Sequence, residues 1–137
     1  MTQLAAAAAF TWFGMVIAIS FLEAPLKFRA PGINVPLGLG IGRLVFRALN
    51  IAEIVLAVLL AIALATGPRT GWAWVPAALA CACLVIQVAV LRSRLDRRAA
   101  VIVAGGQVAP SRLHLGYIAL EVIKALSLVA AGALSLP

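Results

Sequence analysis

The chain has 137 residues, of which 65% are apolar and only 11% are charged, and its mean hydropathy is +1.15. A soluble domain carries about a quarter charged residues, so this composition excludes an ordinary soluble protein and indicates a membrane protein. The net charge of +7 does not indicate a nucleic-acid partner, because the basic residues lie at the ends of apolar runs, without interleaved aromatic residues or a nucleic-acid motif.

Four apolar stretches are long enough to cross a bilayer, whose core of about 30 Å needs roughly 20 residues of helix. We predict spans at about residues 4–22, 44–65, 72–91 and 113–134. These spans must be helices, since backbone groups cannot remain unpaired in lipid. The expected fold class is therefore all-α, an integral membrane four-helix bundle. It forms a single transmembrane domain of residues 1–137, with cytoplasmic loops at 23–43 and 92–112.

The first span ends in the stretch FLEAPLKFRAPG, residues 21–32. No basic region precedes the span and its apolar run is too long for a secretion signal, so we interpret it as a retained helix. Pro25 cannot donate the hydrogen bond that the carbonyl of Phe21 expects, which predicts that the helix bends or ends there. Glu23 would then be a gate residue on the broken turn. The alternative is a plain helix exit, with Lys27 as an anchor that can pair with Glu23 four residues earlier.

Glycines introduce the second helix. Gly38 and Gly42 form a small-x-x-x-small pattern that allows a close approach to a neighbouring helix, or a hinge. The surrounding run PLGLGIGR is not a nucleotide-binding loop, because no βαβ context accompanies it. Gly67-Pro68 is expected to close this helix.

The third helix is expected to outlast the membrane. Residues 92–103 contain no helix breaker, and Gly105-Gly106 can form a C-terminal cap. The arginine-rich extension is either a solvated end that rests on anionic headgroups or a docking site for a partner. Within the span, Cys81 and Cys83 point about 200° apart, so they are expected to be free thiols. Ser111 is a candidate N-cap of the fourth helix.

The charges predict the orientation. Four spans place the first and third loops on one side, and both termini with the second loop on the other. Arg69 is the only basic residue expected on the terminal side. The loop side holds nine: Lys27, Arg29, Arg43, Arg47, Arg92, Arg94, Arg97, Arg98 and Arg112. The positive-inside rule therefore places both termini on the non-cytoplasmic side, with Trp72 and Trp74 at the outer interface. We expect the inner (plasma) membrane of a bacterium.

Ionisable residues inside a membrane are costly, which makes each one a candidate for function. On the fourth span, spacings of 3, 4 and 3 residues place four polar side chains within an arc of roughly 80°. The other three spans add polar residues toward the same, cytoplasmic half. The predicted substrate-binding residues are Glu23, Asn50, Glu53, Gln87, His114, Tyr117, Glu121 and Lys124. Because the outer half is nearly all Ala, Val, Leu and Ile, we expect a cavity open to the cytoplasm and a plugged outer half.

A purely structural role is the alternative for these residues. Glu53 and Glu121 would then only neutralise Lys124 and Arg47 and hold the helices in register. His114 would be an interfacial histidine, and Tyr117 a membrane anchor, because its ring is apolar and its hydroxyl is polar.

The sequence does not support a metal site, a haem site or a known catalytic motif. One histidine, no usable cysteine pair and scattered glutamates do not make a metal site, so we expect no metal. His114, Met1 and Met15 offer no convincing pair of haem ligands, and we expect no cofactor. Catalytic residues cannot be named, because neither a serine–histidine–acid set nor H-E-x-x-H occurs.

A set of short motifs suggests a family. They are Trp12-x-Gly14, Pro25-x-x-Phe28, the glycine-rich start of the second helix with Phe46, and His114 at the start of the fourth. This pattern resembles the four-helix membrane family related to transmembrane protein 205, and more distantly the copper-resistance membrane proteins. The resemblance implies a four-helix membrane fold and no particular activity. A copper function would need Met or His clusters, which the chain lacks.

Three functions remain open. The first is a transporter or channel-like protein for a small cationic or polar solute, expected to be a homo-oligomer because four helices barely enclose a pathway. The second is a membrane enzyme, or a binder of a sterol, quinone or isoprenoid, with Glu and His as acid–base groups. The third is an accessory subunit of a larger membrane complex. Besides the bilayer, a small-molecule ligand is the expected partner.

Overall fold

Four long helical segments make up the part of the chain that the computed structural model describes, residues 1–68 and 71–137. They are Thr2–Arg29, Val35–Thr66, Gly71–Val103 and Leu113–Ser135. Each is long and apolar enough to cross a membrane. The expected all-α four-helix bundle is therefore confirmed, and its segments are consistent with membrane spans.

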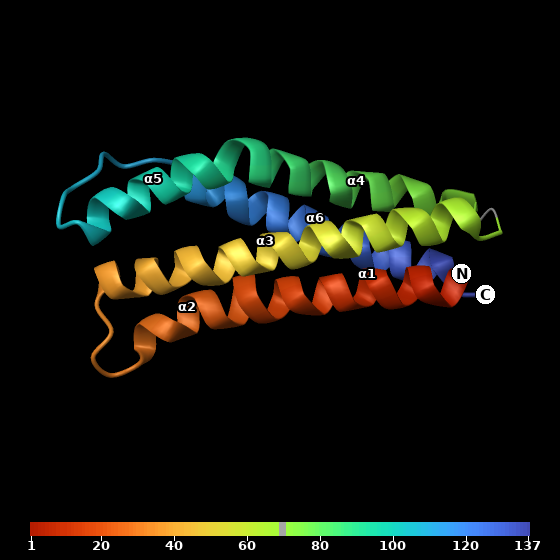
Figure 1. Cartoon of the computed structure of the whole chain (residues 1–137), viewed down its shortest axis with the longest axis horizontal. Coiled ribbons are helices and arrows are strands. Elements are labelled where there is room, and N and C mark those ends of the chain that lie inside the picture. Colours follow the sequence, from red (N-terminus) through yellow and green to blue (C-terminus); the bar gives the residue numbers. More distant parts are fainter. Residues whose placement is uncertain (69–70) are drawn as a thin grey trace.

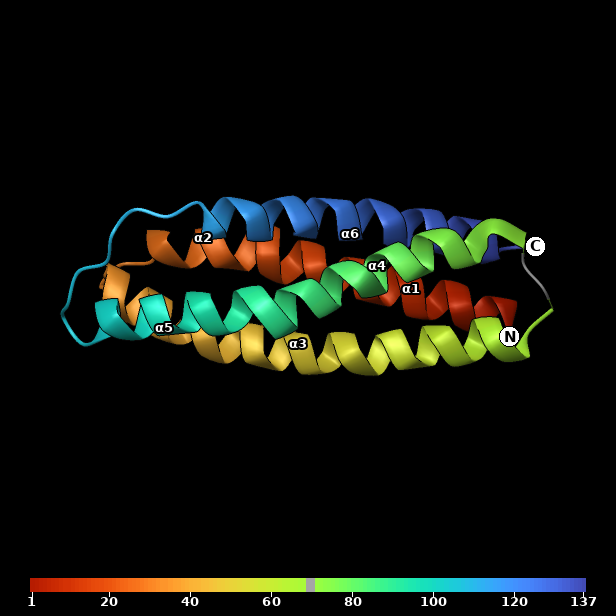
Figure 2. The same cartoon turned by 90° about the horizontal axis from the view of Figure 1, so that it is seen from above.

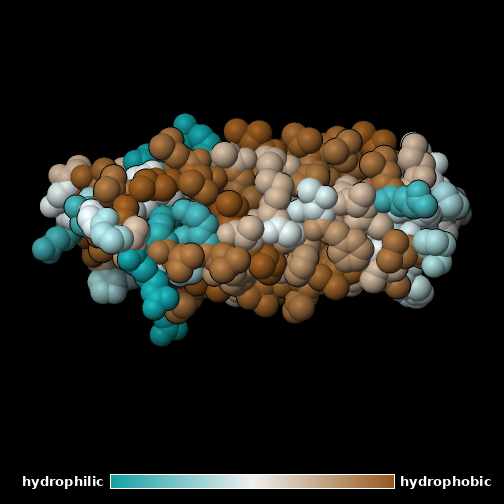
Figure 3. Space-filling model, turned by 90° about the horizontal axis from the view of Figure 1, so that it is seen from below, coloured by the Kyte–Doolittle hydropathy of each residue, from teal (hydrophilic) through white to brown (hydrophobic). Residues whose placement is uncertain are grey.

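The four segments run alternately up and down along one long axis (Figures 1 and 2). Both termini lie at one end of the bundle, and the connections around residues 30–34 and 104–112 lie together at the other end. Most of the predicted loop charges therefore gather at one end, where hydrophilic groups also appear on the surface in Figure 3. Arg69, predicted for the opposite side, lies outside the described residues.

The first segment does not end at Pro25. Helix α1 (Thr2–Val16) passes into a π-helical stretch, Ile17–Glu23, then α2 (Ala24–Leu26) and a 3-10 turn, Lys27–Arg29. In the π stretch the hydrogen bonds span five residues, as from the Ala24 N–H to the Ile19 carbonyl. The widened turn before the proline gives its ring room beside the carbonyl it would otherwise crowd. Of the predicted bend or end at Pro25, the end is wrong, and the helix changes its type here instead.

Helix α3 (Val35–Thr66) begins well before the predicted span at 44–65. Asn34 caps it, since its Oδ1 accepts a 2.9 Å hydrogen bond from the Leu37 N–H, and Pro36 lies in the first turn. Much of the predicted loop 23–43 is thus helical. Apolar composition predicts which residues lie inside the membrane. The start of the helix is determined instead by the capping Asn34 and by Pro36.

Gly38 and Gly42 let α3 approach the end of the first segment, as predicted. A Cβ at Gly38 would overlap the ring of Phe28, and one at Gly42 would lie 3.0 Å from the Nζ of Lys27. Small residues at these two positions therefore allow the contact between the segments.

The third segment comprises a 3-10 turn at Gly71–Ala73, α4 (Trp74–Ile86), a second π-helical stretch at Gln87–Leu91, and α5 (Arg92–Val103). Its C-terminus confirms the predicted glycine cap. Gly105 has a φ of 88°, and Gly106 donates to the Val101 carbonyl at 2.9 Å while Gly105 donates to Ile102 at 3.0 Å. These two bonds form a Schellman motif. Arg98 also donates to the Ala109 carbonyl, which ties the following loop back to α5.

Helix α6 (Leu113–Ser135) is the fourth segment. The hydroxyl of Ser111 accepts a 3.1 Å hydrogen bond from the Leu113 N–H, so it serves the helix start as predicted, although Arg112 occupies the N-cap position itself. The aromatic side chains of Trp72 and Trp74 are exposed near the end of the bundle that carries both termini, opposite the start of α6.

Small side chains fill the half of the bundle near the termini. The core there includes Ala5, Ala8 and Ala9 of α1, Ala63 of α3, Ala77 and Ala80 of α4, and Ala131 of α6. Alanine lets helices pack closely by van der Waals contact, which drives association where the surroundings are already apolar. Large apolar side chains face outward instead and give the bundle the apolar surface seen in Figure 3. The half of the bundle near the termini is therefore packed mainly with apolar side chains, many of them alanine.

Candidate functional site

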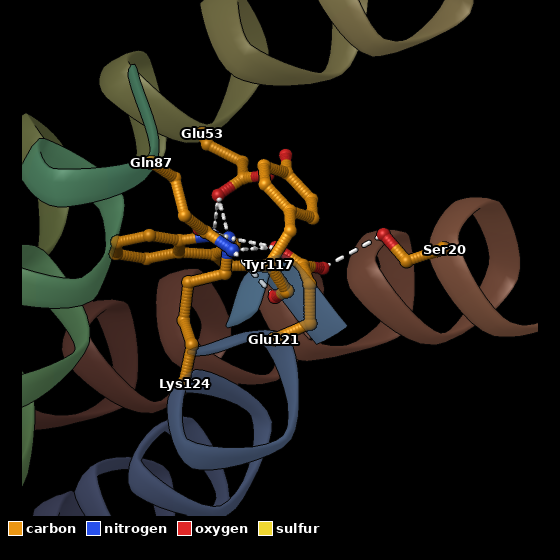
Figure 4. A network of polar contacts seen from close by, with 7 residues as sticks. Ser20, Glu53, Gln87, Tyr117, Glu121 and Lys124 are labelled. Atoms are coloured by element: carbon orange, nitrogen blue, oxygen red, sulfur yellow. Dashed lines mark hydrogen bonds and ion pairs between the residues drawn. The ribbon is translucent and has the colours of Figure 1, made fainter. Parts of the chain in front are cut away.

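A cluster of buried polar side chains crosses the middle of the bundle (Figure 4). Lys124 of α6 stands at its centre, and its Nζ donates to the Glu53 Oε2 at 2.5 Å, the Gln87 Oε1 at 2.7 Å and the Glu121 Oε1 at 2.7 Å. All four side chains are at most 1% exposed. An ammonium group has three protons to donate, so Lys124 is fully satisfied. We call Glu53, Gln87, Glu121 and Lys124 the charge cluster.

The first segment joins the charge cluster through two residues that were not among the predicted site residues. The indole Nε1 of Trp12 donates to the Glu53 Oε2 at 3.1 Å, and the hydroxyl of Ser20 donates to the Glu121 Oε2 at 2.7 Å. Every helical segment of the described chain therefore contributes a side chain, although the first segment does so through Trp12 and Ser20 and not through the predicted Glu23. One signal for Trp12 was available: a tryptophan in mid-span, away from the interface, needs a partner for its N–H.

Both π-helical stretches lie at the level of the charge cluster. Ser20 lies within the first, and Gln87 begins the second. The Nε2 of Gln87 donates to the Glu121 Oε1 at 2.7 Å and reaches the Tyr117 carbonyl at 3.4 Å. Widened turns of this kind are rare in helices and occur often at functional sites. Here they position Ser20 and Gln87, which both bind Glu121.

Helices α3 and α6 run parallel and keep one register through the site. Glu53 contacts Lys124, which lies 71 residues later in the chain. Phe46 meets Tyr117 edge-on at the same offset, with ring centroids 6.0 Å apart. Asn50 is therefore level with Glu121. The stripes of polar residues predicted on these two helices face each other.

Three buried oxygen atoms at this interface have no hydrogen-bond partner among the described residues. They are the Oδ1 of Asn50, the Oε1 of Glu53 and the hydroxyl of Tyr117. Unpartnered polar atoms in a buried position carry a cost, so each requires an explanation. The carboxylates of the cluster also outnumber its ammonium group by two to one.

A cavity of about 530 Å³ lies between the charge cluster and the α2/α5 end of the bundle. Glu121 and Ser20 line it, so the cavity reaches the cluster. Much of its wall is apolar, with Phe21, Leu39 and Ile118 among the lining residues. The cavity lies in the half for which the sequence predicted one.

Basic side chains surround the outer part of the cavity. Lys27, Arg43 and Arg92 line it, together with Asp96. The guanidinium of Arg92 lies 4.7 Å from the ring centroid of Phe46 and 4.6 Å from that of Tyr117, within the range of cation–π contacts. Arg92 also pairs with Asp96 at 3.7 Å. The charge thus changes from basic near the opening to acidic at the floor.

The remaining predicted residues lie farther from the charge cluster. His114 is exposed and lines the cavity, whereas Tyr117 is buried and lines it one turn deeper. Glu23 pairs with Lys27 at 3.7 Å, and it does not line this cavity in the part of the chain that the structure describes. Arg47, the suggested partner of a buried glutamate, is exposed. Lys124, and not Arg47, is the basic residue that pairs with Glu53 and Glu121 among the described residues, because its side chain is buried between them.

The described residues offer few groups for binding a metal ion or for thiol chemistry. Among residues 1–68 and 71–137, no three His, Cys, Asp or Glu side chains lie close enough to hold a metal ion. Cys81 is half-buried and Cys83 is buried, and both are free thiols. The site can therefore bind through hydrogen bonds, charge and apolar contact.

Comparison with protein-family models, with curated proteins and with solved structures finds no match to this chain.

Proposed function

We propose that this four-span membrane protein binds a small polar or cationic solute in its cavity and carries that solute across the membrane. The observation that carries the proposal is the position of Glu121. Its carboxylate lines the floor of the cavity and is held by Ser20, Gln87 and Lys124, which come from three of the four segments. Ionisable groups at membrane depth mark the paths of substrates and ions in many membrane proteins.

The cavity supports a small solute with both a polar and an apolar part. A volume of about 530 Å³ lies within the range of small-molecule sites, which combine an apolar wall with a few placed polar groups. The polar or cationic part of the solute would contact Glu121 and Ser20. Its apolar part would contact side chains such as Phe21 and Ile118.

Transport requires the closed half of the bundle to open. The alanine-rich packing of α1, α3, α4 and α6 closes the half near the termini. Helices that contact each other through small side chains can slide or rotate as packed units. We propose that solute binding at Glu121 favours such a movement, with access alternating between the two ends.

A dye-binding experiment tests the solute site. Purified protein in detergent is titrated with ethidium, an apolar cation, and binding is followed by its fluorescence. We expect saturable binding that Glu121→Gln weakens at least about tenfold, which corresponds to roughly 1.4 kcal/mol. Glu23→Gln is the matched control and should bind as the unmodified protein does. Equal binding by both variants would contradict a role of Glu121 in recognition.

Uptake into proteoliposomes separates transport from binding. Vesicles with the unmodified protein should accumulate ethidium faster than protein-free vesicles, and Glu121→Gln should abolish the difference. Binding without uptake would leave a binding protein and refute the transport step.

A binder of a lipophilic ligand is the second candidate, and the apolar wall of the cavity favours it. Native mass spectrometry of the purified protein would detect a retained sterol, quinone or isoprenoid. A protein that carries no such molecule and gains no thermal stability from added apolar ligands would exclude this candidate.

The membrane, the orientation and the oligomeric state of the protein are also proposals. We infer the inner membrane of a bacterium with both termini outside, from the basic residues at the α2/α5 end. We further propose a homo-oligomer, because four helices barely enclose a pathway, and the same mass spectra would report its size. A stable, monodisperse particle of the isolated chain would weigh against an accessory subunit. The resemblance to the family related to transmembrane protein 205 adds only the expectation of a four-helix membrane fold.

A further inference from the structure

The charge cluster contains more acid than base. Glu53 and Glu121 both contact Lys124, and all three side chains are at most 1% exposed. With both carboxylates ionised, the cluster would have a net charge of −1 in the middle of the membrane. An uncompensated charge in such surroundings costs several kcal/mol or more, so it is normally neutralised.

The groups that surround the cluster do not supply the missing positive charge. The neutral groups near the cluster are Trp12 and Ser20 from the first segment, Asn50 from α3, Gln87 and the Cys83 thiol from the third segment, and Tyr117 from α6. Lys27 and Arg43 line the outer part of the cavity, and Lys27 pairs there with Glu23. Arg92 is the nearby cation of the third segment, and it lies over the rings of Phe46 and Tyr117 and pairs with Asp96. The cluster must therefore reach electrical neutrality in another way.

Hydrogen bonds distinguish the two carboxylates. Glu121 accepts at both oxygens, from Gln87 and Lys124 at Oε1 and from Ser20 at Oε2. Glu53 accepts only at Oε2, from Trp12 and Lys124, and its Oε1 has no donor among the described residues. A carboxylate with donors on both oxygens is stabilised as an anion, whereas the oxygen without a donor is the natural place for a proton.

We infer that the charge cluster is a proton-binding site, and that the proton is held on the Oε1 of Glu53. An O–H bond forms there when a hydronium ion in the cavity water transfers its proton, so that one of its O–H bonds breaks and a water molecule remains; no electrons are transferred. The bound proton makes the cluster neutral, with Glu121 as the anion and Lys124 as the cation.

The neighbouring unpartnered atoms are consistent with this proton. Asn50 lies one turn before Glu53 on α3, and its buried Oδ1 lacks a donor. Tyr117 lines the cavity with Arg92 over its ring, and its hydroxyl has no hydrogen-bond partner in the part of the chain that the structure describes. A hydroxyl can both accept and donate, so Tyr117 provides a step by which the proton passes between cavity water and the α3 side of the cluster.

This site goes beyond the proposed solute binding and does not depend on it. A proton that exchanges with a solute cavity is a means of coupling the movement of the solute to the proton gradient. The charge balance and the free oxygen of Glu53 would remain if the cavity bound no solute.

Infrared difference spectroscopy tests the inference directly, because the chain has only four acidic side chains. A protonated carboxylic acid gives a C=O stretching band that an ionised carboxylate lacks. Reconstituted protein labelled with ¹³C-glutamate should show such a band near neutral pH, and the band should shift with the label. Glu53→Gln should abolish it, whereas Glu23→Gln and Asp96→Asn should leave it unchanged.

A second variant tests the charge balance. Glu121→Gln leaves Glu53 and Lys124 as a balanced pair, so the band should also vanish although Glu53 is intact. Gel filtration and circular dichroism would establish that each variant is folded. A band that survives both Glu53→Gln and Glu121→Gln, or no band in the unmodified protein, would overturn the proposal. So would a band that appears in choline buffer and is abolished by sodium, since a sodium ion would then supply the charge.

Discussion

At the scale of single residues, Lys124 decides the character of the site. Its ammonium group contacts Glu53, Gln87 and Glu121, and it is completely buried. Buried ion pairs give little net stability, but removing one partner leaves a charge that nothing balances. The sequence named these four residues among eight candidates, from their polarity inside apolar spans and from the spacing on the fourth span. It did not predict which oxygen each proton would reach, because that depends on the rotation of four separate helices.

Lys124→Met should therefore destabilise the protein by about 3–5 kcal/mol. The variant removes the cation and leaves two buried acids with fewer donors. Unfolding in mixed micelles with increasing denaturing detergent would measure the loss. The triple variant Glu53→Gln, Glu121→Gln, Lys124→Met removes every charge together and should recover much of the stability. A triple variant less stable than Lys124→Met would contradict this account.

Trp12 is the second residue whose role can be measured. Its indole N–H donates to Glu53 from a fully buried position. Trp12→Phe keeps an aromatic ring and deletes the donor, so we expect a loss of about 1–3 kcal/mol in the free energy of unfolding. Trp74→Phe is the control, because Trp74 is exposed and its replacement should change stability by less than about 0.5 kcal/mol. Equal losses for the two variants would show that the hydrogen bond contributes nothing.

At the scale of helical elements, the structure differs from the sequence-based expectation mainly at the boundaries. Hydropathy located the four spans but placed the start of the second helix too late, since Asn34 caps α3 in a stretch predicted as loop. Pro25 predicted a bend or an end of the first helix, but a π-helical stretch precedes the proline and the segment continues through α2 and a 3-10 turn to Arg29. Neighbouring turns can make room for a proline, and such an adjustment has no simple signature in composition.

The contact of α3 with the first segment provides a matched pair of glycine variants. A Cβ at Gly38 would overlap the Phe28 ring, whereas one at Gly40 meets nothing within 4 Å. Gly38→Ala should force the ring away and lower the melting temperature. Gly40→Ala should raise it, because alanine favours a helix by up to about 1 kcal/mol over glycine. Differential scanning fluorimetry in detergent would compare the two, and a rise for both would show that the close approach at Gly38 is unimportant.

At the scale of the whole molecule, the bundle is asymmetric along its axis. The half near the termini is packed with alanine, and the other half contains the cavity and a concentration of basic residues. Basic loops are retained on the cytoplasmic side during membrane insertion, so this asymmetry predicts an orientation. The bundle itself is compatible with either one.

Cysteine labelling would establish the orientation in cells. Cys81 and Cys83 are first replaced by serine, and a single cysteine is then introduced as Leu136→Cys or Gln107→Cys, both at exposed positions. With both termini outside, a membrane-impermeant maleimide should label Leu136→Cys in intact cells and Gln107→Cys only after permeabilisation. The reverse pattern would invert the topology and place the cavity on the outside.

The sequence by itself determined the helical class, the four apolar segments and the half of the bundle that carries polar groups. Those properties follow from the cost of placing backbone and charge in lipid, which is a property of each residue and its position along the chain. Only the tertiary structure decided that Trp12 and Ser20 join the site, that Glu23 pairs with Lys27 away from the cluster, and that Glu53 keeps a free oxygen. These outcomes depend on helix rotation and register at the level of ångströms, set by the π-helical stretches and by the close packing of small side chains.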